Sequence, residues 1–221
     1  MITQFLIVLL IFFTAFYLSQ LIRSKIRDFR FASLIRNSLF FIPFLLPLLL
    51  TGAPSISFEF EKTFFLSLLL VILISLLGFG ILFKEYEVYL NTDVYYLIKP
   101  LPLHKLIVME FSLIGSAIVE EIFYRYALFE MMNKWNAIFS ILVISLLFAG
   151  VHYLQKDTRK SFTLKTYLIL FFISLGWSIS YIITGNILIP IIGHLFFNLP
   201  NIVITFLQYF VPKKIQQKLE V

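Results

Sequence analysis

Long apolar runs dominate this chain, and they restrict it to one class of fold. Of its 221 residues, 60% are hydrophobic and only 14% are charged, whereas soluble domains are about a quarter charged. A membrane-spanning helix needs around 20 consecutive apolar residues, so the chain has room for about seven to eight spans and little else. We therefore expect an all-α, polytopic membrane helical bundle that forms a single integral membrane domain over residues 1–221.

The apolar runs are separated by polar turns, which places the expected spans. We expect them at residues 2–22, 37–51, 63–83, 106–129, 135–154, 166–183 and 187–210. Pro43 and Pro47 interrupt the second run, and a kink is expected there because proline breaks the helical hydrogen-bond pattern. Residues 84–105 mix acids with tyrosines, which is typical of a membrane interface. A turn is expected at residues 97–102, which contain two prolines.

Basic residues cluster in three segments, and these set the expected orientation. The first cluster follows the first span, the second covers residues 156–165, and the third closes the chain; the first contains Arg23, Lys25, Arg27, Arg30 and Arg36. Basic loops stay in the cytoplasm, so we expect the N-terminus outside and the C-terminus inside. The net charge of +6 then points to anionic lipid and not to nucleic acid.

Targeting and cysteine usage narrow the setting further. The first residues have no basic segment and no small-residue cleavage site, so the first span is expected to be retained. The chain has no cysteine, which excludes disulfides and cysteine-ligated metals. Its short loops favour a bacterial plasma membrane.

Two adjacent carboxylates, Glu120 and Glu121, lie in the expected span 106–129. Inserting an ionisable side chain into such a span costs roughly 2.5–3.5 kcal/mol, so the presence of two adjacent ones requires an explanation. Arg125 follows Glu121 by four residues, and helical residues at this spacing share a face and can pair. A buried ion pair that only fixes helix packing would explain Glu121. It would not explain Glu120, which points about 100° away and is left for chemistry.

Two histidines lie in other apolar runs. Phe148 precedes His152 by one helical turn, and Asn198 follows His194 by one turn. Phe148 can therefore shield the ring of His152, and His194 and Asn198 present polar tips from one face. Ala149 and Gly150 are expected to let a neighbouring helix approach closely. Each histidine alone is more often a packing residue, but polar groups in lipid turn inward and find one another.

The expected inward-facing set is Glu120, Glu121, Arg125, His152, His194 and Asn198. A carboxylate and an imidazole together can activate a water as a general base. A second imidazole and an amide can donate hydrogen bonds to a developing oxyanion. That is a peptide hydrolase site without a covalent nucleophile. The same groups without the amide and the guanidinium, namely Glu120, Glu121, His152 and His194, suit a divalent metal such as zinc, and the spacing leaves both possibilities open.

Two other classes of function compete with hydrolysis. A proton-coupled transporter also uses buried glutamates and histidines, but it would spread polar groups along a path, and the first three spans have almost none. A non-catalytic membrane scaffold, or a bacteriocin self-immunity protein, would keep the same residues for structure. The motif residues are intact whether the protein is a protease or a non-catalytic protein, and a proteolysis assay distinguishes the two.

The three motifs, in this order, resemble those of one known family. Glu120-Glu121-x-x-x-Arg125, Phe148-x-x-x-His152 and His194-x-x-x-Asn198 are similar to the motifs of the CAAX prenyl protease and bacteriocin-processing family, also called CPBP or Abi. The resemblance covers roughly residues 106–205, which would form the catalytic core. It implies an intramembrane endopeptidase that acts on a peptide or membrane protein from the cytoplasmic side. Such enzymes have been described both as metalloproteases and as glutamate proteases.

The resemblance also implies roles for individual residues. Glu120 and His152 would activate water, and His194 and Asn198 would stabilise the oxyanion. The supporting residues would be Glu121, Arg125 and Phe148. One departure is Tyr126, which stands where the family commonly has glycine, and which is expected to narrow the space near the site.

Overall fold

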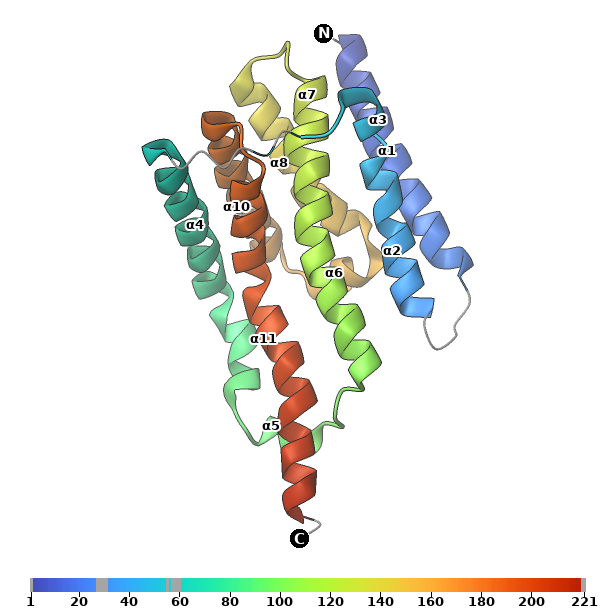
Figure 1. The fold of residues 1–221 in the computed structure, drawn as a ribbon, viewed down its shortest axis with the longest axis vertical. Coiled ribbons are helices and arrows are strands. Elements are labelled where there is room, and N and C mark those ends of the chain that lie inside the picture. Colours follow the sequence, from blue (N-terminus) through green and yellow to red (C-terminus); the bar gives the residue numbers. More distant parts are fainter. Residues whose placement is uncertain (1, 27–31, 55, 57–60, 220–221) are drawn as a thin grey trace.

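The computed structural model describes residues 2–26, 32–54, 56 and 61–219, and these residues form helices joined by short connections (Figure 1). Arg27 and Arg30 of the first basic segment lie outside the described residues. The expected all-helical fold is confirmed. The elements follow the apolar runs closely because each run can satisfy its backbone polar groups in lipid only by forming a helix.

The N-terminal part contains α1 (Ile2–Lys25), α2 (Ala32–Leu45) and α3 (Leu48–Thr51). Pro43 lies inside α2, and Pro47 is the residue just before α3. The expected interruption of the second span is therefore confirmed, because the chain turns between the two helices. Gly52 ends α3 with a φ of 78°, a conformation that glycine adopts without steric cost.

The long helix α4 (Lys62–Tyr86) leads into a segment of short elements. This segment contains the 3₁₀ turn η1 (Glu87–Leu90) and α5 (Val94–Leu97), and the chain is irregular from residue 98 to residue 102. The expected turn at residues 97–102 is thus confirmed. The backbone N–H of Leu101 donates to the carbonyl of Gln208 at 3.1 Å, which ties this segment to the C-terminal helix.

The carboxylate-bearing span is formed by α6 (Leu103–Glu121), a π-helical segment η2 (Ile122–Leu128) and α7 (Phe129–Met131). The sequence predicts one regular α-helix over residues 106–129, and the π-helical segment is a correction to that prediction. Single π turns inside α-helices often occur at functional sites. Here the segment begins at the residue directly after Glu121.

The C-terminal half contains α8 (Ala137–Leu154), α9 (Lys156–Ser161), α10 (Leu164–Thr184) and α11 (Leu188–Leu219). The side chain of Asn136 caps α8, and Thr163 and Thr166 form a capping box at the start of α10. The sequence predicts a loop at residues 156–165, and most of it is instead the short helix α9. The last helix extends beyond the expected residue 210 and contains Pro200 and Pro212.

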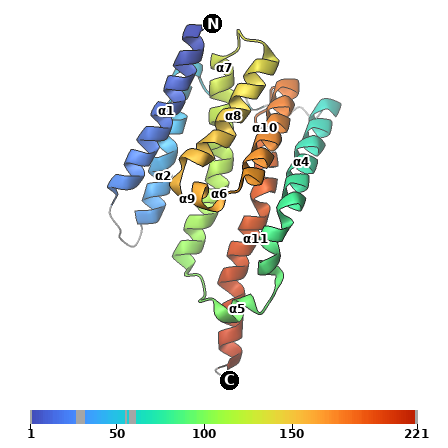
Figure 2. The ribbon, with the colours of Figure 1, turned by 180° about the vertical axis from the view of Figure 1, so that it is seen from behind.

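The helices form two layers (Figures 1 and 2). One layer runs in the order α4, α11, α6, α2 and α1, and α10 and α8 lie behind it. In this arrangement α11 packs between α4 and α6, while α10 packs against α8 and α4. The residues of all three sequence motifs therefore come together where α6, α8 and α11 meet.

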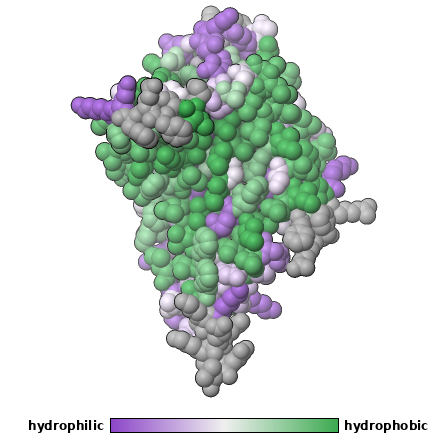
Figure 3. Space-filling model, viewed as in Figure 1, coloured by the Kyte–Doolittle hydropathy of each residue, from purple (hydrophilic) through white to green (hydrophobic). Residues whose placement is uncertain are grey.

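The outer surface of the bundle fits a lipid environment. Apolar side chains cover most of the face shown in Figure 3, and hydrophilic side chains gather toward its two ends. Within the described residues, six helices are long and apolar enough to cross a membrane. The α6–η2–α7 helix is equally long but carries Glu110, Glu120, Glu121 and Arg125, and it makes a seventh crossing. The beginning of α1 and the end of α11 accordingly lie at opposite ends of the bundle (Figure 1).

Candidate active site

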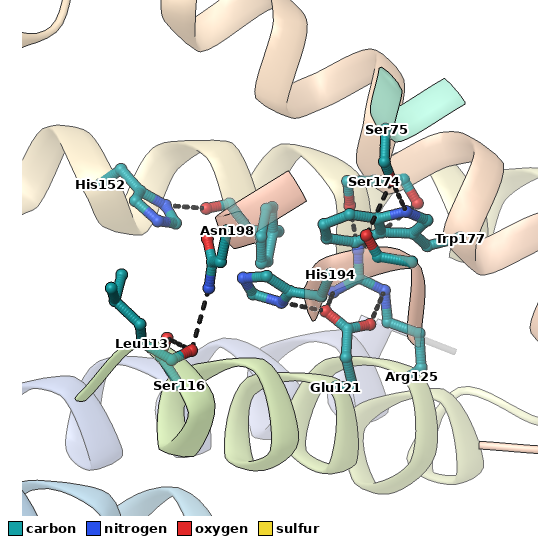
Figure 4. Close-up of polar contacts among 12 residues, drawn as sticks. Ser75, Leu113, Ser116, Glu121, Arg125, His152, Ser174, Trp177, His194 and Asn198 are labelled. Carbon is teal, nitrogen blue, oxygen red and sulfur yellow. Dashed lines mark hydrogen bonds and ion pairs between the residues drawn. The ribbon is translucent and has the colours of Figure 1, made fainter. Parts of the chain in front are cut away.

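The centre of the site is the ion pair of Glu121 and Arg125 (Figure 4). Both side chains are fully buried. The Nε of Arg125 lies 3.1 Å from Oε2 of Glu121, and its Nη1 donates to Oε1 at 3.2 Å. The pairing expected from the spacing of the two residues is confirmed. Arg125 also donates through Nη2 to the hydroxyl of Ser174 on α10 at 2.7 Å.

The π-helical segment helps to align this pair. A π turn takes more residues than an α turn, because its hydrogen bonds join residues i and i+5. In a π-helix, residue i+4 therefore lies closer to the position directly above residue i than it does in an α-helix. Glu121 precedes η2 and Arg125 lies within it, so the guanidinium is placed over the carboxylate.

Three aromatic rings surround the Arg125 guanidinium. Its central carbon lies 4.6 Å from the ring centre of Phe148, 5.4 Å from that of Trp177 and 5.8 Å from that of Tyr124. All three rings are buried, and cation–π attraction is strongest for desolvated cations. The rings thus offset part of the cost of holding this charge away from water.

His194 of α11 is the second partner of Glu121. Its Nδ1 lies 2.8 Å from Oε1 of Glu121, and it must be the donor because an ionised carboxylate can only accept. The imidazole also stacks on Trp177, with ring centres 4.8 Å apart and planes inclined by 23°. Trp177 in turn donates to Ser75 at 3.3 Å, and Ser75 donates to the carbonyl of Gly193 at 2.8 Å.

His152 lies in the last turn of α8 and is half-buried. Its Nδ1 donates to the carbonyl of Phe148 at 2.8 Å, which leaves Nε2 with a free lone pair in the neutral ring. The ring packs between Phe148, 5.2 Å away, and Phe162, 6.1 Å away and nearly parallel. The expectation for Gly150 is wrong, because a Cβ at this position would meet nothing within 4 Å.

Asn198 lies one turn after His194 on α11. Its Nδ2 donates to the carbonyl of Leu113 on α6 at 3.0 Å. An amide nitrogen has two hydrogens, so one N–H remains for another acceptor. Figure 4 shows Asn198, His194 and His152 gathered on the same side of the ion pair.

Phe148 is the point at which the motifs converge. Its ring centre lies 5.2 Å from that of His152 and 5.8 Å from that of His194. The guanidinium of Arg125 lies on the same ring. The structure therefore brings all three motifs into one cluster, and His152 packs into that cluster and not toward lipid.

Glu120 differs from its neighbour in its environment. It is half-buried, and its Oε2 is buried without a hydrogen-bond partner among the described residues. Glu121, by contrast, is held by both a guanidinium and an imidazole. The Glu121 carboxylate is thus held by its partners, whereas the Glu120 carboxylate is free to bind another group.

Comparison with known proteins was informative for one part of the chain. Residues 102–200 match the family described as Rce1-like, type II CAAX prenyl endopeptidase Rce1-like. The match covers 99 of the 221 residues, and this part of the chain is similar to the CAAX protease family. No curated protein and no solved structure matches the chain.

The CAAX protease match includes every residue of the three motifs, from Glu120 to Asn198. The resemblance inferred from the motifs is thereby confirmed. The family indicates a peptidase, with a peptide as substrate and the lipid bilayer as surroundings. Together with the long apolar helices, it makes the chain an integral membrane protein.

Several residues of this CAAX protease site are missed by the motif analysis. Trp177 and Ser174 hold His194 and Arg125, and Phe162 covers His152. The sequence signal that could have identified Ser174 and Trp177 is their spacing of about one helical turn within a mostly apolar run. Tyr126 also differs from expectation. Its hydroxyl contacts the carbonyls of residues 51 and 53, at 3.1 and 3.0 Å, so it points to the end of α3 and does not narrow the site.

The arrangement of donors does not fit a metal centre. Within the part of the chain that the structure describes, no three His, Asp or Glu side chains gather in a way that would hold a metal ion. Glu121, one of the suggested ligands, already binds the Arg125 guanidinium and His194. A metal at this carboxylate would face the positive charge of Arg125.

Proposed function

We propose that this CAAX-type protein hydrolyses a peptide bond within the membrane, using a water activated by Glu120 and His152. The proposal places His194 and Asn198 at the oxyanion. The observation that carries it is the division between the two glutamates. Glu121 is held by the Arg125 ion pair and by His194, whereas no described residue hydrogen-bonds the buried Oε2 of Glu120.

Glu120 and His152 both offer proton acceptors. The free carboxylate oxygen of Glu120 is one, and Nε2 of His152 is the other, because Nδ1 is used by the Phe148 carbonyl. A water between them loses its proton to one of these groups as its oxygen attacks the scissile carbonyl carbon. The same group then delivers that proton to the amide nitrogen as the C–N bond breaks, which leaves a carboxylic acid and an amine.

His194 and Asn198 supply hydrogen bonds on the other side of the reacting carbon. Nδ1 of His194 donates to the Glu121 carboxylate, and this bond fixes the orientation of the ring. When the ring carries a proton on each nitrogen, Nε2 donates to the oxyanion. Asn198 donates through its second N–H, since Leu113 takes only the first. Fixed donors of this kind are worth the most where charge develops in a dry site.

The position of His152 suggests where the substrate enters. The residue lies in the last turn of α8, at the end of the bundle that also holds the end of α1 and the start of α10 (Figure 2). The positive-inside rule favours a cytoplasmic location for this end, because the basic segments gather there. We propose that the site opens there and receives a segment of a peptide or of another membrane protein.

The test compares the parent with two glutamate variants, each purified in detergent and assayed on a peptide library by mass spectrometry. Glu120→Gln should remain folded and lose activity by at least about 10²-fold, since the amide cannot act as a base. Glu110→Gln is the matched control on the same helix, because Glu110 accepts from Thr205 and has no proposed role. Activity of Glu120→Gln within tenfold of the parent would refute its role. A folded parent that cleaves no peptide would favour a non-catalytic scaffold.

A further inference from the structure

The short helix α9 is attached directly to His152. The hydroxyl of Thr158, in the middle of α9, donates to the backbone carbonyl of His152. Phe162, the residue that follows α9, lies nearly parallel to the His152 imidazole, with planes inclined by 16°. The ring of Tyr167 packs edge-on against that of Phe162, with ring centres 5.8 Å apart. Any displacement of α9 therefore moves two contacts of a proposed catalytic residue.

This helix has too few residues to be stable alone. It has six residues, whereas isolated helices shorter than about 12–15 residues are marginal in water. Its position must therefore come from contacts with its surroundings. Thr158 and Phe162 provide contacts on the side of the site, and the opposite side is exposed.

The exposed side of α9 is strongly basic. Lys156, Arg159 and Lys160 are exposed, and the segment contains one acidic residue, Asp157. Arg159 lies over the ring of Tyr153 at 6.0 Å. Lys165, just beyond α9, is already used, because it donates to the carbonyl of Ile81. The net charge of residues 156–161 is positive, and the side chains of Lys156 and Lys160 are exposed.

The location of α9 determines what these charges meet. α9 lies at about the level at which α1 ends, while α4, α6 and α11 extend beyond it (Figure 2); the last turn of α1 carries Arg23 and Lys25. Helices α1, α8 and α10 all have an end at this level. Apolar spans begin or end at this level, which is where lipid headgroups are expected to meet the basic residues.

We propose that α9 binds the anionic headgroups of the membrane surface and that this contact holds His152 in its catalytic position. The proposal rests on the proposed function, because it assumes that His152 acts on the water. Basic residues near an anionic membrane contribute about 1 kcal/mol each. Two lysines then correspond to roughly a 30-fold effect, which is the upper limit for the increase in activity. Anionic lipid thus acts as an activator of the site.

The experiment measures kcat and KM of the full chain in nanodiscs of phosphatidylcholine, with or without added phosphatidylglycerol. The parent should have a several-fold higher kcat with the anionic lipid, and salt should reduce the difference by screening. The double variant Lys156→Gln/Lys160→Gln should lose the difference. The double variant Lys62→Gln/Lys134→Gln removes the same charge at the other end, from the first residue of α4 and from the turn before α8, and it should keep the difference.

Two further measurements separate the possible outcomes. Phe162→Leu should still bind anionic lipid, measured by native mass spectrometry, while its kcat no longer responds to that lipid. An effect that appears in KM, and that follows the acidity of the peptide and not of the lipid, would overturn the proposal in favour of substrate binding by α9. Equal responses of the two lysine double variants would also overturn it. Failure of the proposed function is distinct, because it would abolish cleavage in both lipids.

Discussion

Gly193 precedes His194 directly, and replacing it with alanine tests how tightly the site is packed. A Cβ at this position would lie 2.7 Å from Nε1 of Trp177 and 2.8 Å from Cβ of Val71. Val71 cannot move away easily, because its Cβ is attached to the backbone of α4. Ordinary contacts need about 3.5–4.0 Å, so Trp177 has to shift by about 1 Å. Such a shift breaks its bond to Ser75 and disturbs its stacking on His194.

The size of the effect follows from two opposing terms. Overpacking a core costs about 1–3 kcal/mol, while exchanging glycine for alanine in a helix gains about 0.8–1.0 kcal/mol. Gly193→Ala should therefore lower the free energy of unfolding by up to about 2 kcal/mol. A misplacement of about 1 Å in a catalytic group can cost about 10²-fold in rate. The rise in the activation free energy should therefore exceed the fall in the free energy of unfolding.

Gly150→Ala is the matched control. Gly150 also lies in a helix close to a motif histidine, but a Cβ there would meet nothing within 4 Å. Only the gain in helix propensity remains, so this variant should be as active as the parent and slightly more stable. Unfolding in mixed micelles, followed by tryptophan fluorescence, and cleavage kinetics provide the two readouts. If Gly193→Ala matched Gly150→Ala in both, the packing argument for the Trp177–His194 stack would be refuted.

Four further outcomes are expected. Arg125→Ala removes the guanidinium partner of the buried Glu121 carboxylate and leaves only His194 beside it, so it should cost up to about 3–5 kcal/mol of stability, seen as a low folded yield; a normal yield would contradict this. Asn198→Ala should lower kcat by about 10²–10³-fold with little change in KM, and an unchanged kcat would remove it from the oxyanion site. Tyr126→Phe should cost about 0.5–1.5 kcal/mol of stability and leave kcat unchanged, because its hydroxyl contacts the α3 region; a large fall in kcat would place it in the site. Metal chelators should leave cleavage unaffected, and inhibition reversed by zinc would reinstate a metal.

Local spacing predicted the parts of the site that depend on one helix. The Glu121–Arg125 pair follows from residues four apart on a helix, and the structure confirms it. The contact of Glu121 with His194 was not predictable in the same way. It depends on which neighbour packs against α6, and apolar periodicity identifies the buried face of a helix but not the helix that covers it.

The same limit explains the other differences between expectation and structure. Trp177 belongs to α10, which has no recognised motif, and its role arises only through packing on His194. Helix α9 was expected to be a loop because its intrinsic helix-forming tendency is weak for so short a segment. Its structure depends on tertiary contacts through Thr158 and Phe162. Gly150 was expected to admit a neighbouring helix, and no helix approaches it there.

The π-helical segment η2 has a consequence for how the chain tolerates insertions and deletions. Removing one residue from a regular α-helix turns everything after it by about 100°, which would misplace α8 and the later helices. A π turn holds one residue more than an α turn, so a deletion within residues 122–128 can be absorbed by a return to α-helical geometry. The later helices would keep their places in either case. A deletion at residues 126–128 leaves Glu121 and Arg125 four residues apart and keeps their pair, whereas a deletion at residues 122–124 changes that spacing. Single-residue deletions should therefore be tolerated for folding after Arg125 and lower the folded yield before it.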